Sequence, residues 1–195
     1  MMKMSSNEIK KAGLFHFANS GYDGTSLSAI AGEVGIKKQS IYAHFANKDE
    51  LFLTILNEVL ATERTYIQDF FTKDHLNLKV ALFEFLQGFS KRYEMYDNTK
   101  FLLRMGFLPP THLYQQVMDK VYLFYDDIEK VLIDVFEQNR DSLTEPVNDV
   151  VTAFIGLYDT VLVELLYSGN DRFQKRLHAS WKIFWKGITL HAEAP

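Results

Sequence analysis

The spacing of its apolar residues restricts the fold of this chain more than any other feature. Apolar residues recur at three- and four-residue intervals along nearly all of the 195 residues, and no segment shows the strict alternation of a half-buried strand. Only four prolines occur, and the three internal ones, Pro109, Pro110 and Pro146, stand where a helix is expected to start or stop. The sequence therefore predicts an all-α fold.

The interruptions of this pattern divide the chain into about nine helices. Gly21, Gly35, the Pro109-Pro110 pair and Gly169 mark the clearest breaks. A long fourth helix is expected to join an N-terminal three-helix part, residues 1–47, to a larger helical part, residues 48–195. The predicted helices are about 6–20, 27–35, 37 or 38 to 45, 48–71, 75–95, 99–107, 111–139, 145–168 and 171–191.

Composition excludes several classes of protein. The chain has no cysteine, so disulfide scaffolds and thiolate metal sites are ruled out. Its N-terminus lacks the apolar core of a signal peptide, and its longest apolar run, Val161–Tyr167, is interrupted by Glu164. We therefore expect a cytoplasmic protein with no membrane partner.

Charge is distributed unevenly along the chain. The net charge of the whole chain is -4. Residues 1–52 carry six lysines against five carboxylates, so the excess of negative charge lies in residues 53–195. The chain therefore has a near-neutral N-terminal part, here called the head, and an acidic remainder, here called the body. This difference in charge indicates two roles in one chain. Because the head has few cations, any affinity for nucleic acid must depend on geometry and dimerisation as well as charge.

The segment from Thr25 to Phe45 meets the requirements of a helix-turn-helix. Such a motif needs a small residue where its two helices cross, a turn residue that tolerates positive φ, and buried aliphatic residues that fix the angle. Ala31 supplies the small residue and Gly35 the turn. Ile41 and Phe45, one turn apart, supply the inward face of the third helix.

The outward face of that third helix then carries Lys38, Gln39, Tyr42 and Ala43. Glutamine can bind an adenine edge, lysine can reach guanine or phosphate, and alanine can contact a thymine methyl group. The first 63 residues contain no arginine, so the commonest specific contact to guanine is missing. A tight helical hairpin inside an all-α core is the structural alternative.

Residues 9–52 resemble the TetR family of transcriptional regulators, with an AcrR-like helix-turn-helix. The matching residues are Ile9, Ala12, Phe17, Gly21-Tyr22, Thr25-Ser26-Leu27, Ile30-Ala31, Val34-Gly35-Ile36, Ser40-Ile41-Tyr42, Phe45 and Asn47-Lys48-Asp49-Glu50-Leu51-Phe52. The resemblance implies a homodimer that binds a palindromic operator in double-stranded DNA, usually as a repressor. It further implies that Thr25, Tyr42 and Lys48 contact phosphates.

Three positions of this segment depart from the family pattern. Lys37 replaces a common serine, Gln39 a common glycine and His44 a common aromatic residue. These departures concern which DNA sequence is read and leave the fold assignment intact. The predicted DNA-binding residues are Thr25, Lys37, Lys38, Gln39, Ser40, Tyr42, Ala43, His44 and Lys48.

The resemblance assigns the dimer interface and an effector pocket to residues 48–195. The last two long helices are apolar over a wide arc, which favours a four-helix bundle with a second copy over a wholly intramolecular core. The predicted interface residues are Phe154, Val161, Leu165, Leu177, Trp181 and Phe184. The middle helices are rich in aromatic residues, which predicts a pocket for a small apolar or aromatic ligand. The predicted pocket residues are Phe85, Phe89, Tyr93, Phe101, Met105, Tyr114, Met118, Tyr122 and Tyr158.

An enzyme is the main competing class of function. The six histidines are scattered, and the sequence has neither a paired-histidine metal motif nor a glycine-rich phosphate loop. The sequence therefore predicts a non-enzymatic regulator with no cofactor and no metal. A ligand-binding protein or an architectural DNA-binding protein on the same fold is the alternative.

Overall fold

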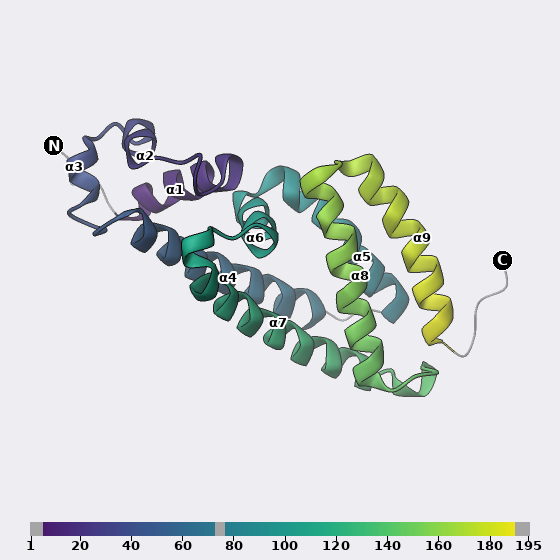
Figure 1. The fold of residues 1–195 in the computed structure, drawn as a ribbon. Coiled ribbons are helices and arrows are strands. Elements are labelled where there is room, and N and C mark those ends of the chain that lie inside the picture. The colour runs from purple at the N-terminus through teal and green to yellow at the C-terminus, as the bar shows by residue number, and fades with distance from the viewer. Residues whose placement is uncertain (1–5, 73–76, 190–195) are drawn as a thin grey trace. The chain divides into compact units, whose positions relative to one another are not determined.

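A computed structural model of the chain describes residues 6–72 and 77–189, and within these ranges it contains helices, turns and one isolated β-bridge. The α-helices are α1 Ser6–Ser20, α2 Leu27–Glu33, α3 Lys38–Ile41, α4 Lys48–Thr72, α5 Leu78–Met95, α6 Asp97–Phe107, α7 Tyr114–Glu137, α8 Val147–Tyr167 and α9 Asn170–Ile188 (Figure 1). Two short 3₁₀ helices, η1 Thr111–Leu113 and η2 Arg140–Ser142, stand on either side of α7. The all-α prediction and the expected number of helices are confirmed.

Most predicted helix boundaries fall within three residues of the observed ones. The third helix is the exception, because α3 ends at Ile41 and residues 42–44 form a turn. Its N-terminal neighbour Lys37 makes no side-chain capping bond, which is consistent with a helix of a single turn. The predicted start at residue 75 and the predicted end at residue 191 lie outside the described residues.

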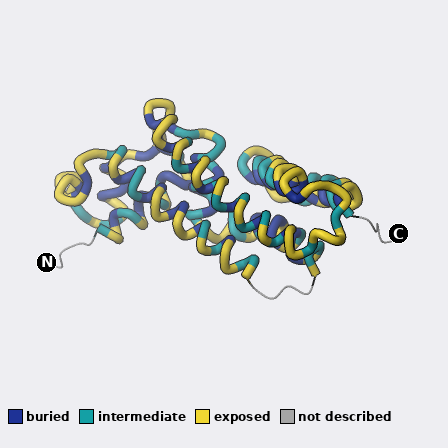
Figure 2. The backbone as a smooth tube through the Cα atoms, turned by 90° about the horizontal axis from the view of Figure 1, so that it is seen from below, coloured by how far each residue is buried: buried dark blue, intermediate teal, exposed yellow. Residues whose placement is uncertain are grey.

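The chain divides into two compact units. The first comprises residues 1–63 and 95–122, and the second comprises residues 64–94 and 123–195. Helices α4 and α7 each begin in the first unit and continue into the second. Along the helices of both units, buried residues recur on one side and exposed residues on the other (Figure 2).

An aromatic cluster forms the core of the first unit. The ring of Phe17 on α1 lies 5.2 Å from that of Phe52 on α4, and Phe52 lies 5.5 Å from Phe101 on α6. All three side chains are fully buried. The Arg104 Nε atom donates to the Ala18 carbonyl at 3.1 Å, which further ties α6 to the end of α1.

Gly13 on α1 marks a close approach between helices. A Cβ atom added there would lie 2.8 Å from Ile55 Cδ1 and 3.5 Å from a Leu51 methyl group on α4. The lack of a side chain at Gly13 therefore permits close packing of α1 against α4.

The second unit has its own aromatic core, built on α5, α8 and α9. Phe89 on α5 lies 5.2 Å from Phe85 and 5.2 Å from Tyr158 on α8. Helices α8 and α9 run side by side as a hairpin (Figure 1), joined at Gly169, which has a φ of 80°. Near the other end of the hairpin the Thr144 amide donates to the Ile188 carbonyl at 2.9 Å.

Helix α8 is long and apolar enough, by length and composition alone, to cross a membrane, with a mean hydropathy of 1.6. The sequence analysis predicted no membrane-spanning segment because Glu164 interrupts the longest apolar run. Half of the apolar window of α8 is buried within the protein, as in the core helix of a soluble domain, so this property is weak evidence for a membrane span.

The aromatic core of the first unit provides a direct test of the fold. Replacing Phe17 by alanine removes a fully buried ring, so we expect Phe17→Ala to lower the free energy of unfolding by about 3–5 kcal/mol. Phe15→Ala, on the same helix at 46% exposure, is the matched control and should cost much less. Urea denaturation measures both, and equal reductions would contradict the packing described here.

Candidate nucleic-acid interface

Helices α2 and α3 are joined by a turn that satisfies the backbone at the end of α2. Gly35 has a φ of 71°, in the left-handed region that favours glycine. The Ile36 amide donates to the Ala31 carbonyl at 2.9 Å, and the Gly35 amide donates to the Gly32 carbonyl at 3.2 Å. This is the Schellman arrangement, and it confirms the predicted turn at Gly35.

The inward side chains of the motif are buried as predicted. Ile30 and Ile41 have no exposed surface, Ala31 is 2% exposed and Phe45 is 5% exposed. Burial on both helices fixes the angle at which α3 is held.

The opposite side of α3 and its following turn is exposed. Tyr42 is 49% exposed, and the remaining predicted reading residues of this segment are exposed as well. Lys37 and Lys38 form no ion pair with any described residue, so both ammonium groups are free to meet an anion. The exposed set is Lys37, Lys38, Gln39, Ser40, Tyr42, Ala43 and His44.

Thr25 was predicted to contact a phosphate at the start of α2, but its side chain is buried. Its side chain is 2% exposed, and its hydroxyl donates to the Gly21 carbonyl at 2.7 Å. The N-cap of α2 is instead Ser26, whose hydroxyl accepts from the Ala29 amide at 3.1 Å. The exposed hydroxyl at the start of α2 thus belongs to Ser26, which sequence reasoning missed although serine is a preferred capping residue.

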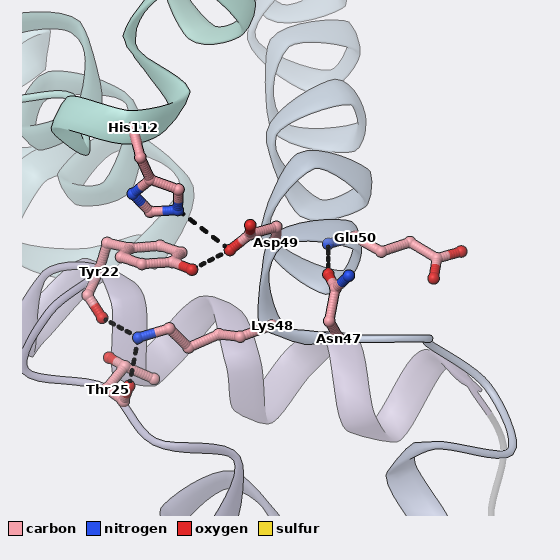
Figure 3. Close-up of polar contacts among 7 residues, drawn as sticks. All are labelled: Tyr22, Thr25, Asn47, Lys48, Asp49, Glu50 and His112. Atoms are coloured by element: carbon pink, nitrogen blue, oxygen red, sulfur yellow. Dashed lines mark hydrogen bonds and ion pairs between the residues drawn. The ribbon is translucent and has the colours of Figure 1, made fainter.

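Lys48, predicted to hold a phosphate, has two partners within the protein. Its ammonium group donates to the carbonyls of Tyr22 and Thr25 at 2.9 and 3.0 Å (Figure 3), and it lies 3.9 Å from the centre of the Tyr22 ring. An ammonium group has three donors, so one remains for an anion. Lys48 therefore anchors the loop between α1 and α2 to the start of α4.

Asp49, the next residue, joins three elements of the first unit. It accepts hydrogen bonds from the Tyr22 hydroxyl and from His112 Nε2, the latter at 3.2 Å (Figure 3). The bond from Tyr22 is the main reason that the pKa of Asp49 is lowered, and His112 and Lys48 lower it further. Burial and the Asp49 carboxylate together raise the pKa of Tyr22. Sequence reasoning assigned no role to either Tyr22 or His112 here.

The start of α4 is capped by the side chains of Asn47 and Glu50. The Glu50 amide donates to Asn47 Oδ1 at 2.8 Å, and the Glu50 carboxylate accepts from the Ala46 amide at 2.5 Å. In the common capping box the acidic side chain returns to the N-cap amide itself. Here it returns to the preceding residue, so the box is present with a shift of one position.

The predicted pocket residues do not form one group. Phe101 and Met105 lie in the buried core of the first unit, whereas Phe85, Phe89 and Tyr158 pack together in the second. Tyr93 and Met118 are partly buried, in the second and first units respectively, and Tyr114 and Tyr122 are more than half exposed. The cavity of the second unit is lined by none of these residues.

The predicted interface residues lie in the interior of a single chain. Phe154, Val161 and Leu177 are fully buried, and Leu165 and Trp181 are nearly so. Phe184, half-buried, packs on Phe154 and Trp181 with ring centres 5.8 and 5.9 Å away. The apolar surfaces of α8 and α9 are thus buried against other residues of the second unit. For these six side chains the alternative of a core within a single chain holds.

Residues 9–55 match the family model described as bacterial regulatory proteins of the tetR family. The solved structures that resemble the chain over nearly its whole length carry the same fold. A TetR transcription regulator from Haloarcula marismortui covers 94% of this chain and 98% of its own, with a TM-score of 0.75 at 16% identity. Residues 9–55 thus match the TetR family, and the remainder of the chain shares the fold of these structures.

Curated relatives match about two-fifths of this chain. The biofilm operon negative regulator IcaR of Staphylococcus epidermidis is 34% identical over 83 residues, 40% of this chain and 43% of the relative. The repressor BdcR of Escherichia coli is 34% identical over 80 residues, 41% of this chain and 39% of the relative. The chain thus spans about two-fifths of the length of the curated relatives it matches. Both relatives are named as transcriptional regulators.

A further neighbour has been solved with a ligand. The transcriptional regulator FadR of Bacillus subtilis, in complex with stearoyl-CoA, covers 94% of this chain and 100% of its own, with a TM-score of 0.68 at 16% identity. At that identity the comparison establishes the fold alone.

The lowered pKa of Asp49 predicts a pH-dependent contribution to stability. A carboxyl whose pKa is depressed on folding stabilises the folded state above its unfolded pKa of about 3.9, and this contribution is lost as pH falls through the folded pKa. We expect Asp49→Asn to reduce the free energy of unfolding at neutral pH and to have a smaller effect near pH 3. Urea titrations at both pH values measure this. Asp23→Asn, an exposed aspartate, is the control, and an Asp49→Asn effect of equal size at both pH values would contradict the assignment.

Proposed function

We propose that this chain is a cytoplasmic transcriptional regulator that binds a palindromic DNA operator as a homodimer, represses from it, and is released by a small-molecule effector. The observation that carries the DNA-binding part is the row of exposed polar residues on α3, held at a fixed angle by fully buried Ile30 and Ile41. A solvent-facing row of this kind on the second helix of a helix-turn-helix fits the major groove.

The relatives support the direction of regulation. IcaR is named as a negative regulator and BdcR as a repressor, and each is 34% identical to this chain over about 80 residues. The stearoyl-CoA complex of FadR indicates that this fold can hold a small-molecule ligand.

The exposed side chains divide into base contacts and phosphate contacts. Gln39 is suited to an adenine edge and Ala43 to a thymine methyl group. Lys38 and the Tyr42 hydroxyl are suited to phosphates. Lys48 contributes its one remaining donor, so its larger role is to hold the loop before α2 in place.

Substitutions at Lys38 and Gln39 are expected to change different properties of DNA binding, namely its affinity and its sequence specificity. Removing one lysine that neutralises a phosphate lowers the salt slope of binding by about 0.9, so Lys38→Ala in a dimer should lower it by about 2 and weaken binding to all sequences alike. Gln39→Ala should relax specificity at one base position in each half-site. Gel shifts with DNA upstream of the protein's own gene, at several salt concentrations and with single-base variants, measure both.

The control for these variants is Lys91→Ala, an exposed lysine on α5, which should bind as the native chain does. A uniform decrease in affinity with Gln39→Ala would remove its assigned base contact. Failure of the native chain to retard any promoter DNA specifically would count against the DNA-binding proposal as a whole.

The exposed face of α8 supports dimerisation. Thr152, Gly156 and Thr160 follow one another at four-residue spacing and are all exposed. A glycine in the middle of a helix costs about 1 kcal/mol relative to alanine. A Cβ atom at Gly156 would meet nothing within 4 Å, so no packing inside the chain requires a glycine there. On this exposed face Gly156 would permit close approach of a helix from a second copy, and Ile183 on α9, at 74% exposure, offers apolar surface for the same contact.

Gly156→Leu tests this interface. The added side chain has room in one chain but not against a closely packed second copy, so we expect the sedimentation coefficient to shift from dimer to monomer at micromolar concentration. Gly32→Leu, at another helical glycine with open space around it, should leave the dimer intact. A native chain that sediments as a monomer would contradict the proposal, as would a Gly156→Leu variant that remains fully dimeric.

A further inference from the structure

The second unit contains a cavity of about 790 Å³, within the range of pockets that bind small ligands. Its walls come from the end of α4, the start of α5, the end of α7 with η2, and α9. The lining residues are Gln68, Phe71, Thr72, Asn77, Leu78, Lys79, Ala81, Val131, Asp134, Val135, Gln138, Asn139, Ser142 and Trp185. None of these belongs to the aromatic set that the sequence predicted for an effector pocket.

Uncommitted hydrogen-bonding groups stand along one side of this cavity. Asp134 and Gln138 are one turn apart on α7, and Gln68 lies on α4. All three are exposed, and none of their side chains bonds to any other residue within the described ranges. Together they offer a carboxylate and two amides, which means several acceptors and four N–H donors.

Three half-buried lining residues, called the floor of the cavity here, are apolar or aromatic. Phe71, Leu78 and Trp185 are each half-buried. The Trp185 ring is stacked on that of Trp181 at 5.5 Å, which fixes its orientation. The Lys79 ammonium lies 5.9 Å from the centre of the Trp185 ring.

We propose that this cavity binds a saccharide and that the saccharide is the effector of the regulator proposed above. A pyranose ring has apolar C–H faces, which suit an aromatic floor, and a perimeter of hydroxyls that both donate and accept, which suit amides and a carboxylate. A hydrogen bond from a hydroxyl to a carboxylate is among the stronger kinds. An acyl chain would leave Asp134, Gln68 and Gln138 without partners while covering them, which costs free energy.

Tryptophan fluorescence of the full chain tests this assignment directly. The chain has two tryptophans, of which Trp185 lines the cavity and Trp181 is 7% exposed. The probes are glucose, glucosamine and cellobiose, with benzoate and decanoate as apolar competitors. We expect at least one saccharide to change the emission saturably, with a Kd of about 1 mM or below. Trp185→Phe should abolish the change, and Trp181→Phe should retain it.

Two variants on α7 separate the cavity from the rest of the helix. Asp134→Asn should raise the Kd of the responding saccharide about tenfold, because the variant can no longer form a charge-assisted hydrogen bond. Asp126→Asn makes the same change at an exposed position of α7 outside the cavity and should bind as the native chain does. Gel shifts with and without the saccharide then report whether binding weakens the complex with DNA.

The outcomes distinguish this inference from the regulator proposal. Saturable binding that Asp134→Asn weakens and that releases DNA supports both. No response to any saccharide, or a response to decanoate instead, overturns the saccharide assignment, and DNA retardation by the same sample would leave the regulator proposal standing. Saccharide binding without any effect on DNA affinity overturns its role as effector. A response unchanged by Asp134→Asn overturns the placement of the site.

Discussion

The exposed face of α3 depends on the burial of apolar side chains behind it. Ile30, Ile41 and Phe45 are almost completely inaccessible to solvent, and each contributes on the order of 1.5–3 kcal/mol relative to an exposed side chain. Helix α3 has only four residues, too few to be stable by itself. Its position is therefore set by these contacts and by the bonded turn at Gly35, and the polar row is held outward as a consequence.

Adjacent residues at the start of α4 complete this arrangement through charge. Lys48 binds the carbonyls of the loop before α2, while Asp49 binds the Tyr22 hydroxyl and His112 (Figure 3). One ammonium group is thereby largely committed to the fold. Residues 1–52 contain only six lysines and no arginine, so few cations remain for phosphates. In the homodimer proposed above, each copy would add its own phosphate contacts and so raise the affinity of a weakly charged unit.

The helix-turn-helix could be predicted from sequence because each requirement involves near neighbours. The positive φ at Gly35 and the small Ala31 are dictated by local geometry, and four-residue spacing places Ile41 and Phe45 on one face. The burial of Thr25 was not predictable in this way, because a capping hydroxyl and a buried one differ by a single position in Thr25-Ser26. The Tyr22 and His112 contacts to Asp49 were also missed, since His112 is 63 residues away from Asp49 along the chain.

The aromatic residues of the body show what the spacing of apolar residues in the sequence cannot predict. A helical pattern identifies which arc of α8 or α9 is apolar, but not whether that arc meets the same chain or a second copy. Phe154 and Leu177 proved to be internal, and the small residues Gly156 and Thr160 are the ones that face outward. Large rings gain most free energy where neighbours contact them on all sides, so they fill a core more often than they wall a cavity. Unbonded polar groups are better guides to a ligand site. Asp134 and Gln138 line the cavity without a side-chain partner among the described residues, so a ligand with hydrogen-bonding groups could bond to them.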